Sequence, residues 1–152
     1  MIYFTSVNDI SKSSKFQRFV IENSRPVWGI TELSSATFKR INSGDLILFY
    51  FQGRIIFASE VNKTNIDKNL SIELFGTYTH LHKGTLHWSN LIYFKNVGKS
   101  LDISFQEIVK VANYSPKFSI RRLISLNEIG MKYVRENFAS EMAFIESIHK
   151  QK

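Results

Sequence analysis

The stretch INSGDLILFYFQGRIIFASEV, residues 41–61, constrains the fold more than any other part of the chain. Residues 46–51 and 54–61 are rich in β-branched and aromatic side chains, and Gln52-Gly53 lies between them, which predicts a tight hairpin. Apolar side chains occupy both faces of this hairpin, whereas a half-solvated antiparallel sheet alternates apolar with polar residues. The hairpin is therefore predicted to be central and buried on both faces, in a strongly curved sheet or barrel with helices packed outside.

The size and composition of the chain predict one globular domain, residues 1–152. With 152 residues, 43% of them hydrophobic, the chain can bury a core of its own. The 13 Phe, 6 Tyr and 2 Trp are mostly expected in that core, with a few left for a site. No cysteine is present, which excludes disulfides, thiolate metal sites and a cysteine nucleophile.

The net charge of +7 predicts an anionic partner, and a solvated basic surface without a bound polyanion is the alternative. No run of 18 apolar residues is present, and Met1 leads directly into an apolar, strand-like segment without a basic region before it. We therefore predict no transmembrane helix, no signal peptide and no membrane partner, which favours a cytoplasmic location.

The remaining elements follow from periodicity, turn residues and helix caps. The segment 71–86 fits neither a helix nor a strand clearly, and we leave it open. Strands are predicted at 1–6, 88–97 and 119–124, a loop at 62–70, helices within 11–23 and from the capping box Ser104–Glu107 to Ala112, and a C-terminal helix of about 126–148 after a second capping box, Ser125–Glu128, with a bend near Ser140.

Motifs of catalysis are missing from the sequence. There is no P-loop, no GxGxxG, no HExxH and no GxSxG. His80, His82 and His87 lie close together, but a zinc site needs further protein ligands, so surface histidines are the simpler interpretation. We predict no catalytic residue, no metal and no cofactor.

Several segments, in this order, resemble the EVE domains and the related YTH domains of the PUA-like superfamily over residues 1–136. The resemblance implies an α+β fold: a bent β-barrel of five to six strands flanked by helices. The matching segments are Thr5-Ser6, Trp28-Gly29, Gly44-Asp45-Leu46-Ile47-Leu48-Phe49-Tyr50, Ile55-Ile56-Phe57-Ala58-Ser59-Glu60-Val61, Trp88 to Val97, and Arg122-Leu123-Ile124-Ser125-Leu126.

The resemblance also implies a function. In YTH domains an aromatic pocket holds a methylated base flipped out of the strand, and EVE-like domains of modification-dependent restriction systems, including McrB-type GTPases, read modified DNA bases. The chain is thus expected to bind nucleic acid, DNA rather than RNA, as a specificity module without enzymatic activity. A fused or associated GTPase or nuclease would supply translocation or cleavage.

The family pattern places the pocket residue by residue. Val27-Trp28-Gly29 matches the segment that carries the first cage tryptophan, with the Gly29 carbonyl accepting from the base. A polar residue at the end of the first strand contacts the base edge, and the register leaves Ser6 and Asn8 open. The second wall departs from the family, because its loop offers aromatic residues other than Trp; this leaves the preferred base open. The predicted pocket comprises Trp28, Gly29, Ser6, Asn8, Tyr78, Phe75 and Trp88.

Each aromatic member of that set has a core residue as its alternative interpretation. Lysine and arginine side chains near the motifs are candidates for phosphate contacts, although each can also be a solvated charge. The candidates are Arg25, Lys39, Arg40, Arg54, Lys83, Arg121 and Arg122. Three other functions stay open: a PUA-like RNA-binding domain without modified-base specificity, an ASCH-type enzyme acting on a nucleotide, and a protein-interaction module.

Overall fold

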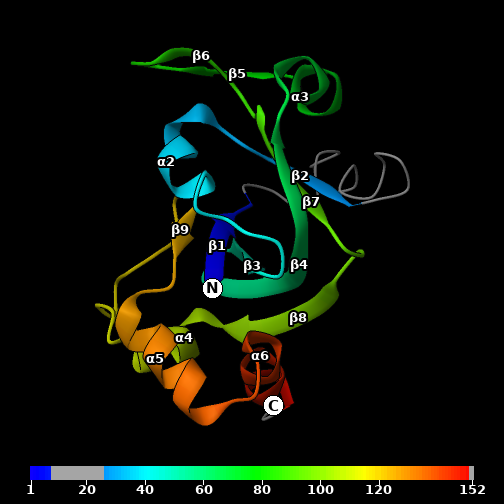
Figure 1. The fold of residues 1–152 in the computed structure, drawn as a ribbon. Coiled ribbons are helices and arrows are strands. Elements are labelled where there is room, and N and C mark those ends of the chain that lie inside the picture. Colours follow the sequence, from blue (N-terminus) through cyan, green and yellow to red (C-terminus); the bar gives the residue numbers. More distant parts are fainter. Residues whose placement is uncertain (8–25, 151–152) are drawn as a thin grey trace. The chain divides into compact units, whose positions relative to one another are not determined.

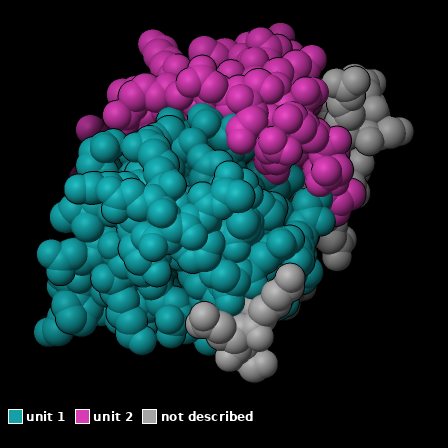
Figure 2. Space-filling view, turned by 60° about the horizontal axis from the view of Figure 1, so that its bottom comes forward, with its two compact units in different colours: residues 1–8, 45–59, 98–152 teal, residues 9–44, 60–97 magenta. Residues whose placement is uncertain are grey.

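The computed structural model describes residues 1–7 and 26–150 of the chain. The helix predicted within 11–23, and the candidate residues Asn8 and Arg25, lie outside the described residues. The chain divides into two compact units (Figure 2). Unit 1 comprises residues 1–8, 45–59 and 98–152, and unit 2 comprises residues 9–44 and 60–97.

Unit 1 contains the hairpin that dominates the sequence. β3 (Leu46–Phe51) and β4 (Arg54–Ile66) are joined by Gln52 and Gly53 (Figure 1). Both turn residues have positive φ, 47° and 79°, as type I′ hairpin turns require. The first four side chains of β3, on both faces, are buried. The hairpin and its burial on both faces are confirmed there, and β4 continues beyond the predicted end.

Three further strands complete the sheet in unit 1. β1 (Ile2–Ser6) pairs in parallel with β3 and antiparallel with the short β9 (Ile124–Ser125). The strand predicted at 119–124 is therefore shorter than expected and begins only at Ile124. β8 (Lys99–Ser104) pairs antiparallel with the first half of β4.

Helices cover the core of unit 1. α4 (Phe105–Ala112) begins at Ser104, whose hydroxyl accepts from the Gln106 N–H, so the predicted cap at Ser104 is confirmed. Glu107, the other residue of the predicted capping box, pairs with Lys110 at 3.5 Å. The buried face of α4 supplies Phe105, which meets Phe4 edge-on with ring centroids 5.6 Å apart.

The C-terminal helix is two helices, α5 (Glu128–Asn137) and α6 (Glu141–Lys150). The break has a local cause, because Phe138 is extended and ends α5. The second capping box is corrected as well: Asn127, not Ser125, caps α5, and its Oδ1 accepts from the Gly130 N–H at 2.8 Å.

Unit 2 is organised around β7 (Asn90–Phe94). β7 pairs antiparallel with β2 (Val27–Ile30) and with the second half of β4. A one-turn 3₁₀ helix, η3 (Glu32–Ser34), and α2 (Ser35–Phe38) follow β2.

The other elements of unit 2 fill the segment that the sequence left open. α3 (Lys68–Phe75) begins at Asp67, whose carboxylate accepts from the Leu70 N–H, and ends at Gly76. β5 (Thr77–His80) and β6 (Gly84–His87) then form a separate two-stranded ribbon (Figure 1). The loop predicted at 62–70 is wrong, because β4 runs to Ile66. Its polar residues suit the half-exposed strand that they form.

The α+β class is confirmed, whereas the barrel is corrected. In the described part of the chain seven strands form one open sheet, in the order β2-β7-β4-β3-β1-β9 with β8 on β4, accompanied by five α-helices. The sheet has more strands than the five or six predicted because β4 is long enough to pair with two strands. Its residues Arg54–Ala58 pair with β8, and its residues Val61–Ile66 pair with β7. No helix among the described residues is both long and apolar enough to cross a bilayer.

Candidate functional site

Two pairs of aromatic side chains, from three parts of the sequence, lie in unit 2. Trp28 and Phe75 meet edge-on, with ring centroids 6.1 Å apart and an interplanar angle of 69°. Tyr78 and Trp88 lie 6.1 Å apart with their rings tilted by 49°. We call Trp28, Gly29, Phe75, Tyr78 and Trp88 the aromatic cluster. All five are residues that the sequence predicted for the pocket.

Gly29 allows the cluster to pack. A Cβ at this position would lie 2.6 Å from the Trp88 Cβ, 2.9 Å from the Phe75 Cε2 and 2.9 Å from the Trp88 carbonyl oxygen. Real Cβ atoms do not approach other heavy atoms so closely. The glycine of the Val-Trp-Gly segment is therefore the point at which β2 admits both Phe75 and Trp88.

Hydrogen bonds hold the two residues that follow Trp88 in the chain. The Ser89 carbonyl accepts from the Asp67 N–H at 2.9 Å. The Asn90 amide is buried and donates to the Thr31 carbonyl at 3.2 Å and to the Ser35 hydroxyl at 3.1 Å. Sequence reasoning missed Asn90, because a lone asparagine at a strand start carries no signal for partners 55 or more residues away.

Exposure differs sharply across the aromatic cluster. Trp28 and Phe75 are 8% and 6% exposed, whereas Tyr78 is 46% exposed and Trp88 is intermediate. The cluster thus has a buried end at Trp28 and an accessible end at Tyr78. The accessible rings are the ones that can stack on a ligand without rearrangement.

Two contacts between Glu32 and His87 anchor the base of the β5–β6 ribbon beside Trp88. The Glu32 carboxylate accepts from the His87 backbone N–H at 3.0 Å, and its other oxygen lies 3.0 Å from the His87 Nδ1. Burial raises the pKa of Glu32, but these contacts with His87 outweigh burial and hold the pKa below its ordinary value. The pair joins η3 to the residue that precedes Trp88.

Replacing Glu32 with glutamine should remove a pH-dependent part of the stability. Because the folded-state pKa is depressed, the charge of Glu32 stabilises the fold above its unfolded-state pKa and ceases to do so as the pH falls through the folded-state value. Urea unfolding of wild type and Glu32→Gln should differ by less than about 1 kcal/mol near neutral pH, because the carboxylate is partly solvated. The difference should shrink as the pH falls below the ordinary glutamate pKa of about 4.3. A difference independent of pH would contradict the stabilising contacts of the charged Glu32 carboxylate.

The other two histidines of the segment lie at the turn of the ribbon. The His80 Nδ1 accepts from the backbone N–H groups of His82 and Lys83, each at 3.1 Å. His80 thus closes the turn, while His87 is engaged with Glu32. Among the described residues no three His, Cys, Asp or Glu side chains are grouped as a metal site requires.

Known structures share this arrangement of elements. The N-terminal domain of Thermococcus gammatolerans McrB, solved bound to m5C DNA, has a TM-score of 0.56 at 16% identity, covering 89% of this chain and 95% of that one. The Pho92 YTH domain, solved in complex with m6A, has a TM-score of 0.51 at 14% identity, covering 91% and 84%. A Pseudomonas putida protein has a TM-score of 0.52 at 9% identity, covering 90% and 98%.

The chain has an EVE/YTH-like fold. The resemblance predicted from the sequence is therefore confirmed at the level of the fold, for which these low identities are sufficient. No family model matches the chain, and no curated protein matches it by sequence.

Within this EVE/YTH-like fold, Ser6 ends β1 in unit 1, where it pairs with Tyr50 of β3 and is half-buried. The predicted role of Ser6 at the base edge stays a prediction.

The basic candidates are spread over both units. Lys39, Arg40 and Lys83 are exposed in unit 2, and Arg121 and Arg122 are exposed in unit 1. Arg54 is ion-paired with Asp102, so its charge is already balanced. Lys83 stands out, because it shares the β5–β6 ribbon with Tyr78.

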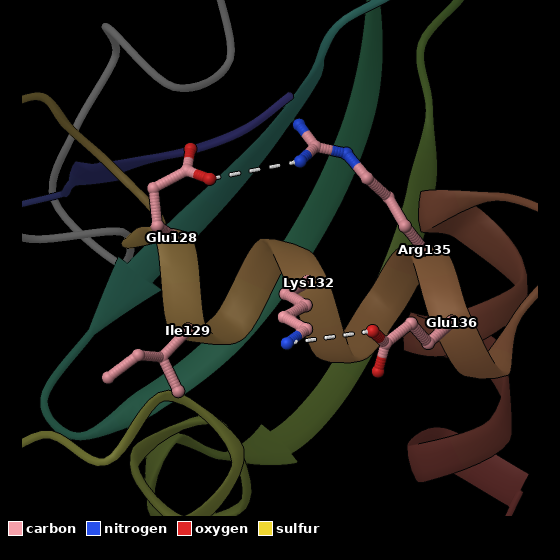
Figure 3. A pocket seen from close by; sticks show the side chains of 5 residues that line it. All are labelled: Glu128, Ile129, Lys132, Arg135 and Glu136. Atoms are coloured by element: carbon pink, nitrogen blue, oxygen red, sulfur yellow. Dashed lines mark ion pairs between the residues drawn. The ribbon is translucent and has the colours of Figure 1, made fainter.

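A surface hollow on α5, of about 430 Å³, differs in character from the aromatic cluster (Figure 3). Arg135 pairs with Glu128 at 4.0 Å and Lys132 pairs with Glu136 at 3.9 Å across its walls. Ile129 is its fifth lining residue. Its lining includes no aromatic ring and its charges neutralise one another, so it offers neither a stacking surface nor a net charge for a nucleotide.

Proposed function

We propose that this chain is a nucleic-acid-binding module that recognises a methylated base, in DNA rather than RNA. The observation that carries the proposal is the aromatic cluster, with Tyr78 and Trp88 at its accessible end, in a fold shared with two domains solved with methylated bases. The first of these was solved with methylated DNA, which favours DNA for this chain. The net charge of +7 suits an anionic polymer.

The extruded base would meet the exposed rings first. Tyr78 and Trp88 offer π-faces for stacking, and the Gly29 carbonyl is the expected acceptor for the base edge. Trp88 packs against the apolar cluster that contains Phe75, and Trp28 packs on Phe75. Stacking on one aromatic ring is worth roughly 1–3 kcal/mol. Extruding a base from a duplex costs a few kcal/mol, so phosphate contacts must supply the remainder.

Selectivity for the methyl group needs more than its burial. One buried methyl adds roughly 0.8 kcal/mol, about fourfold in affinity. A cluster whose walls leave a void beside the unmodified base would add to this, because unfilled space forfeits contacts. The close approach of Phe75 and Trp88 at Gly29 supports such a closely packed wall.

The proposed biological role is the specificity domain of a modification-dependent restriction system. Two of the structural neighbours were solved bound to m5C DNA and to m6A, which supports a binding role. Cleavage or translocation would then belong to a GTPase or nuclease fused to or associated with this chain.

Replacing Tyr78 with alanine should remove much of the preference for the modified base. We expect wild type to prefer oligonucleotides bearing N6-methyladenine or 5-methylcytosine over unmodified ones, in a panel of single-stranded and duplex DNA and RNA. Tyr78→Ala should weaken binding to the preferred oligonucleotide by roughly 1–3 kcal/mol and to the unmodified one much less. Fluorescence anisotropy at fixed salt measures both.

A matched control is Tyr133→Ala, since Tyr133 is an exposed tyrosine on α5 in unit 1. It should leave both affinities unchanged. The contribution of phosphate contacts is measured separately, from the dependence of the binding constant on salt concentration. About three to six phosphate contacts should give a slope of about −3 to −5 when the logarithm of the binding constant for duplex DNA is plotted against the logarithm of the salt concentration. Equal affinity for modified and unmodified oligonucleotides would indicate a general PUA-like RNA-binding domain instead. Turnover of a nucleoside would indicate an ASCH-type enzyme. A lack of affinity for nucleic acid at low salt would indicate a protein-interaction module.

A further inference from the structure

The turn of the β5–β6 ribbon exposes an apolar side chain. Leu81 is 89% exposed, more than any other large hydrophobic residue in the described part of the chain. His80, His82 and Lys83 flank it directly. An isolated exposed leucine is ordinary. A leucine this exposed at the turn of a two-stranded ribbon, close in sequence to two histidines and a lysine, is unusual enough to need a reason.

The tip is held in a defined shape. Thr77 pairs with His87 and His80 pairs with Gly84, so the ribbon stays in register up to the turn. The two hydrogen bonds to the His80 Nδ1 close the turn, and Gly84 takes the positive φ of 74° that lets the chain reverse. Figure 1 shows the ribbon extending beyond the other elements of unit 2 in that view. The turn therefore holds the backbone at Leu81 in a defined position while the side chain is exposed.

The ribbon also suits a polyanion. Between Glu73 and Asp102 the sequence contains no acidic residue, and the β5–β6 ribbon lies wholly within this interval. Glu32 contacts the ribbon at His87, the end away from the turn. An exposed apolar tip with a cation and no acidic residue near it in the sequence matches the surface of a nucleic acid duplex, where phosphates flank an apolar stack of bases.

The tip belongs to the same ribbon as the accessible end of the aromatic cluster. Tyr78 and Leu81 are three residues apart, which along an extended strand is about 10 Å. One ribbon can thus present Tyr78 to an extruded base and Leu81 to the duplex beside it.

We propose that Leu81 is a wedge that enters a DNA duplex next to the extruded base, while Lys83 and the flanking histidines contact the adjacent phosphates. This inference rests on the proposed function. An apolar side chain inserted between base steps opens the stack and fills the space that the flipped base leaves. The wedge would make duplex DNA, rather than a single strand, the natural substrate.

The test uses the full chain and one oligonucleotide sequence carrying the mark that wild type prefers, N6-methyladenine or 5-methylcytosine. Three forms are compared: a paired duplex, a duplex in which the mark faces an abasic site, and the single strand. A 2-aminopurine beside the mark reports unstacking by its fluorescence. Leu81→Ala is compared with Leu33→Ala, because Leu33 is a second exposed leucine of unit 2. Both changes are at exposed positions and should leave the fold intact.

Leu81→Ala should weaken binding to the paired duplex about tenfold, the worth of burying part of one leucine. Its effect should stay within about twofold for the abasic duplex and the single strand, where extrusion costs less or nothing. The 2-aminopurine signal should fall in the paired duplex only, and Leu33→Ala should change none of these values.

An unchanged affinity for the paired duplex, or an equal loss in all three forms, would overturn the wedge. Binding to phosphatidylserine vesicles that is lost in Leu81→Ala, with DNA binding intact, would overturn it in favour of a membrane-inserting tip. The proposed function fails separately, if wild type shows no preference for the mark even in the single strand. The wedge is then judged by the unmodified paired duplex alone.

Discussion

Trp28→Ala should lower the free energy of unfolding by about 3–5 kcal/mol, the usual result of truncating a buried tryptophan. Only 8% of Trp28 is exposed, and its ring meets Phe75 edge-on. Alanine would leave a cavity beside Phe75 and remove a side chain from β2. Urea denaturation at neutral pH, followed by circular dichroism, measures the change.

The control is Tyr78→Ala at the accessible end of the aromatic cluster. Tyr78 is half-exposed, so its truncation should change the free energy of unfolding by less than about 1 kcal/mol. A comparably small loss for Trp28→Ala would show that Trp28 is not packed as the structure has it.

Binding separates the two roles that Trp28 can have. At a temperature where Trp28→Ala is folded, a stacking ring should weaken binding to the modified oligonucleotide by roughly 1–3 kcal/mol and spare the unmodified one. A core residue should weaken both only in proportion to the unfolded fraction. The hypothesis that Trp28 contacts the base fails if both affinities fall equally.

The hairpin could be predicted from the sequence because its signals are local and agree. Two runs of β-forming residues flank Gln52-Gly53, and the absence of polar alternation already requires burial on both faces. The cap at Ser104 is equally local, since the hydroxyl bonds to a backbone N–H two residues away. The cap of α5 was predicted wrongly because Ser125 and Asn127 can both cap a helix, so the local sequence does not distinguish them. Tertiary contacts decide between the two residues. Asn127 wins because its amide also donates to the Ala112 carbonyl at 2.8 Å.

The long reach of β4 could not be predicted, because its second half is stabilised by pairing with β7 rather than by its own composition. The same limit applies to the candidate site. The family pattern named the five residues of the aromatic cluster, but burial at Trp28 and exposure at Tyr78 depend on packing that the sequence does not display. The contact between Glu32 and His87 joins residues 55 positions apart and leaves no local signal.

Gly29→Ala should lower the free energy of unfolding by about 1–3 kcal/mol, as overpacking usually does. Gly29 has no positive φ, so the effect comes from crowding and not from backbone strain. The new methyl would meet the Trp88 Cβ at 2.6 Å and the Trp88 carbonyl oxygen at 2.9 Å. Neither atom can swing away as the end of a side chain can. β2 and the backbone at Trp88 must therefore separate.

That separation should also act on recognition, because it moves Trp88 relative to Tyr78. We expect Gly29→Ala to weaken binding to the methylated oligonucleotide more than to the unmodified one, which reduces the preference. Competition between the two oligonucleotides for one labelled probe measures the ratio directly, at a temperature where the variant is folded.

Gly98→Ala is the matched control for lost stability. Gly98 has φ of +92°, and a Cβ there would press on the Ala58 carbonyl oxygen and lie 2.8 Å from the Ser59 Cβ, all within unit 1. It should destabilise the protein at least as much as Gly29→Ala and leave the ratio of the two affinities unchanged. If both variants reduce the preference equally, the loss follows stability, and Gly29 has no part in recognition. If Gly29→Ala alone reduces it, the spacing of Phe75 and Trp88 around this glycine sets the selectivity for the methylated base.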